Sequence, residues 1–391
     1  MILVSCTGQK TGKENDNNDK IAIEVGEIKF PPQDVLQLKS YYLSSSVHVD
    51  SIDYLIGYNY RLHSLDCMNL KSKSVTQIVL PGDGPDAIVR LSGIYAQSLD
   101  SVWISDESER AFLIDSVGTI KRMIDLKKYL EDQEQLLINT NYAMFTSHLF
   151  YNASRHSLMF LVKHTPSNTF IVKEVFIDEV GKMATYQLSS SKVVPDMSKG
   201  YAYINFPNVN FVGENIVYNY PVESSIYMLD IRTNERKYIL ADSHYTSNII
   251  EKCTTSGDYA TLEKHWLENS HFYDIMYLPK YKIYARLHAD KVDFDEKKGM
   301  EKLINERDLY LMLFDENMEK IGEIKARFAE AGERLKKASM RTEAESAAGL
   351  LENLEQTYRE DTRSGVQALI RRSEKQREAL EKETARIYQL Q

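Results

Sequence analysis

One short stretch decides the fold: residues 111–126 read AFLIDSVGTIKRMIDL. Apolar and polar residues alternate on both sides of a turn that contains Val117 and Gly118, and Asp115 closes the first half. Alternation with a period of two is typical of β-strands, and aspartate or glycine supplies the backbone geometry of a tight turn. The stretch therefore predicts a β-hairpin.

The same pattern recurs along the chain. It is found at residues 61–80, 111–126, 170–188, 226–240 and 309–324. Another pair of short apolar stretches precedes each hairpin, such as residues 91–95 with 102–105. The repeating unit is therefore four strands at a spacing of about fifty residues, which predicts the blades of a β-propeller. Residues 21–30 form a further expected strand, placed to close the ring by pairing with a last blade.

An aspartate ends the first strand of each hairpin. We interpret these aspartates as turn residues that accept backbone hydrogen bonds, rather than as a set of catalytic carboxylates. They are Asp66, Asp115, Asp178, Asp230 and Asp315.

The composition limits the class of protein. With 391 residues, 43% of them apolar, the chain can bury a sizeable core. The net charge of -9 argues against a nucleic-acid-binding surface, which needs a basic field. The 25 tyrosines suit half-buried sheet surfaces, where the ring packs and the hydroxyl reaches water. Three cysteines are too few for a disulfide framework, so we predict that Cys67 and Cys253 are buried free thiols, and no Cys/His spacing predicts a metal site.

The first residues, Leu3-Val4-Ser5-Cys6, look like a bacterial lipobox, in which a signal peptidase cuts before the cysteine and a lipid is attached to it. Residues 7–20 are polar and rich in Asn, Asp and Lys, as a flexible tether would be. Only five residues precede Cys6, so the charged and apolar parts of a signal peptide would lie upstream of Met1. The alternative is a chance match.

Residues 325–391 differ in texture from the rest. They contain no proline, and their 14 Lys and Arg against 12 Asp and Glu give a charge of +2, while the remainder carries -11. Apolar residues recur at helical spacing on both sides of a polar break at residues 360–364, and Asp361 can cap the second helix. We predict a tether over residues 1–20, a β-propeller over 21–324 and a charged α-helical hairpin over 325–391.

Three features carry a resemblance to a known family: the lipobox-like start, the loop PGDGPD at residues 81–86, and HFYDIMYLP at residues 271–279 with Tyr281, Tyr284 and Arg286 after it. Residues 1–324 resemble predicted bacterial lipoproteins of unknown function with TolB-like, six-bladed β-propeller domains. The resemblance implies a mainly β, exported and lipid-anchored protein, and it implies no reaction. The chain departs from the family because no sixth blade is recognisable after Ile324, so the last blade is missing or replaced.

Residues 350–391 carry a second resemblance, through YREDTRSGVQAL at residues 358–369 and the charged segment after it. They look like the N-terminal extension of ribonuclease HII, a family in which the catalytic domain follows. We carry over no catalytic residue and expect no ribonuclease activity. An exported lipoprotein and a nuclease extension do not belong together, so we expect a fusion, a recombination or an assembly artefact. The alternative is a chance match of charged helical sequence.

The candidate ligand residues are Asp83, Asp86, His265, His271, Tyr273 and Arg286. The loop of Asp83 and Asp86 offers few oxygens for calcium, and its alternative role is a connection between blades that needs glycine. His265 and His271 are six residues apart, which is not the spacing of a helical zinc pair. His265 with Trp266 and His271 with Tyr273 would instead line a carbohydrate or peptide pocket. Arg286 belongs to the stretch that carries the family resemblance.

The expected function is binding. We predict a lipid-anchored propeller of the cell envelope, at the outer membrane or in the periplasm, whose partner is a glycan, a peptide or an envelope protein. No catalytic residue, metal site or cofactor is predicted, apart from the weak calcium alternative. The alternative function is a metal-dependent enzyme of the lactonase or lyase type, which rests on analogy with other propellers alone.

Limited proteolysis with intact-mass detection tests the domain boundaries. We expect a resistant core that ends near Ile324, with the charged tail lost early, because a segment without a packed core is cleaved first. A tail that survives as long as the core would contradict the predicted division of the chain.

Overall fold

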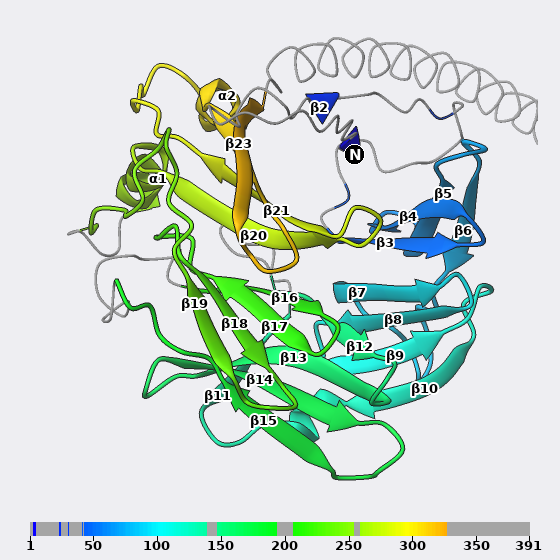
Figure 1. Cartoon of the computed structure of the whole chain (residues 1–391). Helices are drawn as coiled ribbons and strands as arrows, with labels where there is room; N and C mark the ends of the chain where they lie inside the picture. Colours follow the sequence, from blue (N-terminus) through cyan, green and yellow to red (C-terminus); the bar gives the residue numbers. More distant parts are fainter. Residues whose placement is uncertain are drawn as a thin grey trace, which may run out of the picture. The chain divides into compact units, whose positions relative to one another are not determined.

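The computed structural model describes residues 3–4, 23–24, 30, 41, 43–138, 147–193, 206–253 and 259–326. The chain divides into a unit of residues 1–327 and a unit of residues 328–391. Cys6 and most of the tether lie outside the described residues, as does the predicted helical hairpin apart from residues 325–326. Those two residues end a β-strand, so the propeller extends two residues further than predicted. Within the first unit, five antiparallel sheets follow one another along the chain (Figure 1).

Each sheet is built from strands that are neighbours in sequence, and we call the sheets blades 1 to 5. Blade 1 contains β3 (Ser44–Val49), β4 (Ile52–Asn59), β5 (Ser64–Asn69) and β6 (Val75–Val79). Blade 2 contains β7 (Leu91–Ser98), β8 (Ser101–Asp106), β9 (Arg110–Ile114) and β10 (Ile120–Asp125), and a short 3₁₀ helix, η2 (Leu126–Tyr129), follows it. The hairpin quoted from the sequence is β9 and β10.

Blade 3 contains β11 (Glu134–Leu137), β12 (Phe150–Asn152), β13 (Ser157–His164), β14 (Thr169–Phe176) and β15 (Met183–Gln187). Both β11 and β12 pair with β13, so the first strand of this blade is split in two. Blade 4 contains β16 (Asn208–Val212), β17 (Asn215–Asn219), β18 (Ile226–Asp230) and β19 (Arg236–Ile239). Blade 5 contains β20 (His271–Leu278), β21 (Ile283–Ala289), β22 (Leu309–Phe314) and β23 (Lys320–Ala326). A separate pair joins β1 (Leu3–Val4) to β2 (Ile23–Glu24).

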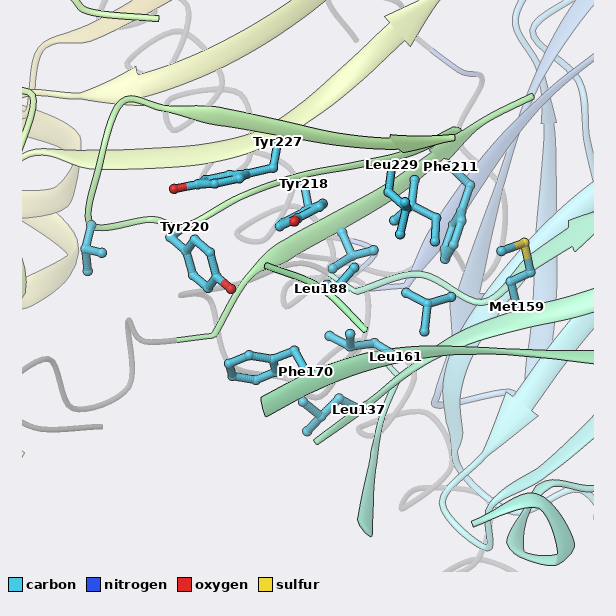
Figure 2. Packing of buried hydrophobic residues seen from close by; sticks show 14 of the residues in the cluster. Leu137, Met159, Leu161, Phe170, Leu188, Phe211, Tyr218, Tyr220, Tyr227 and Leu229 are labelled. Carbon is cyan, nitrogen blue, oxygen red and sulfur yellow. The ribbon is translucent and has the colours of Figure 1, made fainter. Parts of the chain in front are cut away.

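Apolar side chains between successive blades form the core. One cluster joins blades 1 and 2, a second joins blades 2 and 3, a third joins blades 3 and 4, and a fourth joins blades 4 and 5. In the third cluster, Leu161 of blade 3 lies among the rings and branched side chains of blade 4, including Tyr218 and Leu229 (Figure 2). Four-stranded sheets that follow one another along the chain and pack face to face are the blades of a β-propeller. The five predicted blades are therefore confirmed.

Tyrosine side chains stabilise this core in two ways: their rings pack against one another, and their hydroxyls form hydrogen bonds with the backbone. The rings of Tyr218 and Tyr227 stack with their centroids 5.1 Å apart, and both are buried. The Tyr218 hydroxyl accepts a hydrogen bond from the backbone N–H of Ser189, and the Tyr220 hydroxyl donates to the carbonyl of the same residue. Burial raises the pKa of Tyr220 well above its ordinary value, so this group stays a neutral donor.

Three of the five hairpin aspartates have the predicted role. Asp115 accepts hydrogen bonds from the backbone N–H groups two and four residues ahead, and Asp315 does the same. Asp230 accepts from the N–H groups of the next turn residues, Arg232 and Thr233. These carboxylates accept hydrogen bonds from backbone N–H groups that have no backbone acceptor within the turn. This structural role explains the aspartates without a catalytic function.

The prediction was wrong for Asp66 and Asp178. Asp66 lies inside β5 and is fully buried, where it accepts hydrogen bonds from Tyr41, Asn59 and Gln77. The strand continues past it, and Asn69 takes the turn position instead. Asp178 lies after β14 and pairs with Arg122 and His156 at the surface. Both predictions failed because they depended on the residue at which a strand ends. Period-two alternation indicates that a strand is present, but it does not fix its last residue.

Within its described residues, the region expected to hold strands alone also contains two α-helices. They are α1 (Tyr259–Leu267), between blades 4 and 5, and α2 (Met300–Glu306), between β21 and β22. Trp266 and Leu267 of α1 and Leu303 of α2 are buried in the cluster that joins blades 3 and 4. Tertiary burial of these apolar residues therefore stabilises helices that are too short to persist alone. In the described part of the chain, no helix has the length and apolar character to cross a membrane.

The two cysteines within the propeller are buried free thiols, as predicted. Burial raises the pKa of Cys67 to about 12, which keeps the thiol protonated and unreactive.

Gly57 of β4 gives a test of the packing at the start of the ring. A Cβ at this position would overlap the ring of Tyr41, which lies against it. We expect Gly57→Ala to lower the unfolding free energy by about 1–3 kcal/mol, because the ring must move out of its place. Urea denaturation in a double-mutant cycle with Tyr41→Ala is the measurement, and the loss should shrink once the ring is gone. Equal losses in both backgrounds would contradict the contact.

Candidate functional site

The topology places two kinds of loops on opposite edges of the sheets. In a four-stranded antiparallel blade, the turn between the second and third strands lies on the same edge as the link to the next blade. We call this edge the connector face and the opposite edge the turn face. Two long connections, which we call the excursions, lie on the connector face. They are residues 240–270 between blades 4 and 5, of which 254–258 lie outside the described residues, and residues 290–308 within blade 5.

Most of the exposed large apolar side chains in the described residues also lie on the connector face. Fewer are found on the turn face, where Val117, Val180 and Tyr281 are exposed. The larger number on the connector face makes it the candidate binding surface. On the connector face they are Tyr60, Leu62, Val89, Val193, Leu240, Tyr245, Ile249 and Ile304.

One buried arginine holds the two excursions together. Arg307, at the end of α2, donates hydrogen bonds to the carbonyl oxygens of Asp290 at 2.7 Å and Asn269 at 2.6 Å. It also donates to the carbonyl of Trp266 at 3.4 Å, and its guanidinium lies over the Trp266 ring. A guanidinium has five donors in a fixed plane, so one side chain can satisfy carbonyls from both segments. Burial lowers the pKa of Arg307.

The connector at residues 240–253 is also held in place. The N–H of Ile250 donates to the carbonyl of Val222, and the N–H of Ser224 donates to the carbonyl of Asn248. The ring of Tyr245 stacks on Tyr310 of β22 with centroids 4.8 Å apart. The exposed Leu240, Tyr245 and Ile249 therefore belong to an ordered segment, which presents them at fixed positions.

The structure separates the predicted pair of histidines. His265 lies on α1, and its Nε2 is 2.6 Å from the carbonyl oxygen of Glu251. His271 begins β20 and is fully buried, where its Nδ1 accepts a hydrogen bond from the indole N–H of Trp266. Of the other candidate ligand residues, Tyr273 contacts His271, with the ring centroids 4.6 Å apart. The two histidines therefore have different partners and do not converge on one ligand position.

Arg286 is fully buried between blades 4 and 5. Its guanidinium donates to the carbonyl oxygens of Ser224 and Ala241 and lies over the ring of Phe272. Burial lowers the pKa of Arg286 to about 9, and the nearby carboxylate of Glu323 opposes that shift. In this position the side chain joins two blades, and the geometry gives it no access to a ligand from solvent.

A serine, a histidine and a glutamate lie together beside Arg286. Ser243 Oγ is 3.0 Å from His288 Nε2, and Glu323 Oε1 is 2.5 Å from Ser243 Oγ and 3.0 Å from the same Nε2. Although burial alone would raise it, hydrogen bonds from His288, Lys320 and Ser243 lower the pKa of Glu323. For His288, by contrast, burial itself lowers the pKa.

This arrangement does not have the geometry of a catalytic triad. A triad needs the carboxylate on one ring nitrogen of the histidine and the serine on the other. Here both groups meet Nε2, and a neutral His288 uses that N–H as a donor, so it cannot accept the serine proton. Ser243 Oγ also accepts hydrogen bonds from the N–H groups of Tyr245 and Thr246, which makes it a turn residue of the connector.

The loop of Asp83 and Asp86 links blade 1 to blade 2 on the connector face. Both aspartates are exposed, and Gly84 between them has a φ of 91°, which favours glycine. The carbonyls of Pro81 and Gly84 accept hydrogen bonds from Ile88 and Ala87. In the part of the chain that the structure covers, no group of three or more His, Cys, Asp or Glu side chains is placed to hold a metal ion.

Sequence reasoning named Arg286 as a candidate ligand residue, but it missed His288, Arg307 and Glu323, which also organise this region. His288 and Arg286 occupy alternate positions of β21, and two polar residues on the inward face of an apolar strand were the available signal. Arg307 and Glu323 offered no such signal. Their partners are distant in sequence, with Glu323 and Ser243 separated by 80 residues.

Comparison with known proteins supports the fold. The family model for the domain of unknown function DUF4221 matches residues 14–325, and the model for the ribonuclease HII N-terminal domain matches residues 320–391. The chain is similar to the crystal structure of a DUF4221 member from Bacteroides vulgatus, with 14% identity, a TM-score of 0.60 and coverage of 76% of this chain and 84% of that one. It is also similar to a Bacteroides fragilis protein inferred to be exported, with 14% identity, a TM-score of 0.48 and coverage of 78% and 77%. Curated proteins yield no match.

The buried His271 predicts how stability depends on pH. Burial lowers the pKa of His271 from 6.5 to about 3, so the folded protein keeps it neutral while the unfolded chain takes up a proton. The stability that this neutral group supports is present above pH 6.5 and falls by about 1.4 kcal/mol per pH unit below it. Urea unfolding at about pH 7 and about pH 5 is the measurement, and His271→Gln should lose about 2 kcal/mol less than the parent over this interval. Glutamine can still accept the Trp266 hydrogen bond, so identical losses would show that His271 is solvated.

Proposed function

Because this chain belongs to the DUF4221 family of unknown function, we propose that it is an exported, lipid-anchored, six-bladed β-propeller that binds another envelope protein through its connector face. The observation that carries the proposal is that most of the exposed large apolar side chains of the described residues lie on that face. Exposing them to water costs free energy, and a partner that covers them recovers it.

The chemistry of this face favours a protein partner. Leucine, isoleucine and valine make up most of its exposed large side chains, with Tyr60 and Tyr245 as the aromatic members. Aliphatic side chains suit the apolar centre of a protein interface, whereas a glycan site needs aromatic platforms and convergent hydrogen-bonding groups. The ordered connector around Arg307 holds part of this surface in one conformation, which lowers the entropy lost on binding.

Lipid attachment at Cys6 would have a structural consequence. The structure pairs Leu3–Val4 with Ile23–Glu24, and cleavage before Cys6 would remove the first of these two strands. In the processed protein, residues 7–20 then act as the tether to the membrane. A precursor with a lipoprotein signal peptide ahead of Met1 allows the test: Cys6→Ser should abolish incorporation of radiolabelled palmitate.

The binding proposal is tested by changing one face and not the other. Replacing Leu240, Ile249 and Ile304 together by serine should weaken binding to detergent-solubilised Bacteroides envelope proteins by about tenfold or more, or about 1.4 kcal/mol. The matched control replaces the exposed turn-face residues Val117, Val180 and Tyr281 by serine, and it should bind like the parent.

Surface plasmon resonance on the immobilised propeller measures both variants, and thermal unfolding confirms that each is folded. Equal binding by the parent and the connector-face variant would refute the proposed surface. Equal loss in both variants would show that the binding is non-specific.

A further inference from the structure

One lysine of blade 3 lies at the edge of the apolar core. Lys163 follows Leu161 by two residues on β13, so both side chains point to the same face, and Lys163 pairs across the sheet with Phe170 of β14. Leu161 and Phe170 belong to the cluster that joins blades 3 and 4 (Figure 2). β13 ends at His164, and the turn that follows it lies on the connector face. Lys163 is therefore at the connector-face end of this cluster.

Two phenyl rings lie beside the ammonium group of Lys163. Its Nζ is 4.7 Å from the ring centroid of Phe206 and 5.9 Å from that of Phe170. The two rings contact each other edge to face, with centroids 5.6 Å apart. A lysine ammonium within about 6 Å of an aromatic ring is attracted to the negative face of the π-system. The rings thus position the ammonium, but they supply no anionic partner.

Lys163 differs from the other shielded cations of the propeller in having no such partner. Within the residues that the structure describes, every other lysine or arginine that is buried or half-buried donates to a carboxylate or a backbone carbonyl. Lys173 donates to Glu134, for example, and Lys320 donates to Glu323. In the same part of the chain, the Lys163 ammonium forms no hydrogen bond or ion pair.

The missing counter-ion has an energetic consequence. Burial lowers the pKa of Lys163, and no neighbouring charge contributes to that shift. A cation that is partly removed from water without an anion is unfavourable, and an anion that binds beside it offsets this cost. The position is therefore prepared for a negatively charged group.

The surroundings of Lys163 favour a carboxylate over a phosphate group. Phosphate is bound best by several donors or by the planar fork of an arginine, whereas this position offers a single ammonium beside two rings. A carboxylate on a short aliphatic chain can accept a hydrogen bond from Nζ while its methylene groups pack on the half-buried ring of Phe206. Aspartate and glutamate side chains have this form.

We propose that Lys163, Phe170 and Phe206 form a carboxylate-binding subsite on the connector face, which receives an aspartate or glutamate side chain of the partner protein. The inference rests on the proposed function and names the chemical group by which the partner is recognised. A partner without a carboxylate at this point would leave the ammonium covered and unpaired, so the subsite adds specificity to an otherwise apolar surface.

Two peptides that differ by one charge test the subsite without a partner protein. The lysines of the full-length chain are converted to ¹³C-dimethyl-lysine, which keeps the positive charge, and the Lys163 resonance is identified by its loss in Lys163→Arg. Titration with acetyl-Leu-Glu-Leu-amide should shift this resonance to saturation. The peptide acetyl-Leu-Gln-Leu-amide should bind at least about fivefold more weakly, because it lacks the charge that the ammonium pairs with.

The matched control is Lys280, whose ammonium lies 5.5 Å from the ring centroid of Tyr281 on the turn face. Its resonance, identified in Lys280→Arg, should respond to neither peptide. Equal affinities of the two peptides at Lys163 would overturn the proposal, as would equal responses at Lys163 and Lys280 or no response at Lys163. None of these outcomes depends on an envelope protein, so failure of the proposed interface is distinguishable from failure of this subsite.

Discussion

The packing of one sheet against the next is the constraint on which the rest of the structure depends. A four-stranded antiparallel sheet has two faces, and in this chain both faces of most blades carry apolar residues. Neither face can be left in water without a large loss of stability, so each blade must lie between two others. That requirement turns a linear series of hairpins into the successive, face-to-face blades of a propeller.

Between blades 4 and 5 the packed interface also contains buried polar and charged side chains. Arg286, His288 and Glu323 lie fully buried between them, where unpaired charges would be costly. The carboxylate meets the imidazole, Ser243 and the backbone N–H of His244, while the guanidinium meets backbone carbonyls. Arg286 of blade 5 reaches the carbonyls of Ser224 and Ala241 at blade 4, and the Glu323 carboxylate holds Ser243 and His244 of the connector. The network therefore fastens blade 4 and the connector to blade 5. The Ser–His–Glu grouping is a product of this requirement, and its geometry is that of a structural network.

The connector face has a different character from the interior of the ring. Its excursions are tied down by Arg307 and by backbone hydrogen bonds from residues 248–250, so they are ordered although they contain no blade strand. Order combined with exposed apolar side chains is what distinguishes a prepared binding surface from a mobile loop. This face therefore has features that core packing alone does not require.

The sequence by itself determined the repeating unit. Period-two alternation and the turn residues are local properties, so the five hairpins, their strands and the free buried cysteines could be predicted from single stretches. It did not determine α1 and α2, because short helices depend on burial of Trp266, Leu267 and Leu303 against other parts of the fold. It did not determine the roles of Asp66 and Arg307, since their partners come from distant strands and loops. The same division holds for the candidate site. Its loops could be located in the sequence. The different partners of His265 and His271, and the burial of Arg286, arise from contacts that form only when the blades pack.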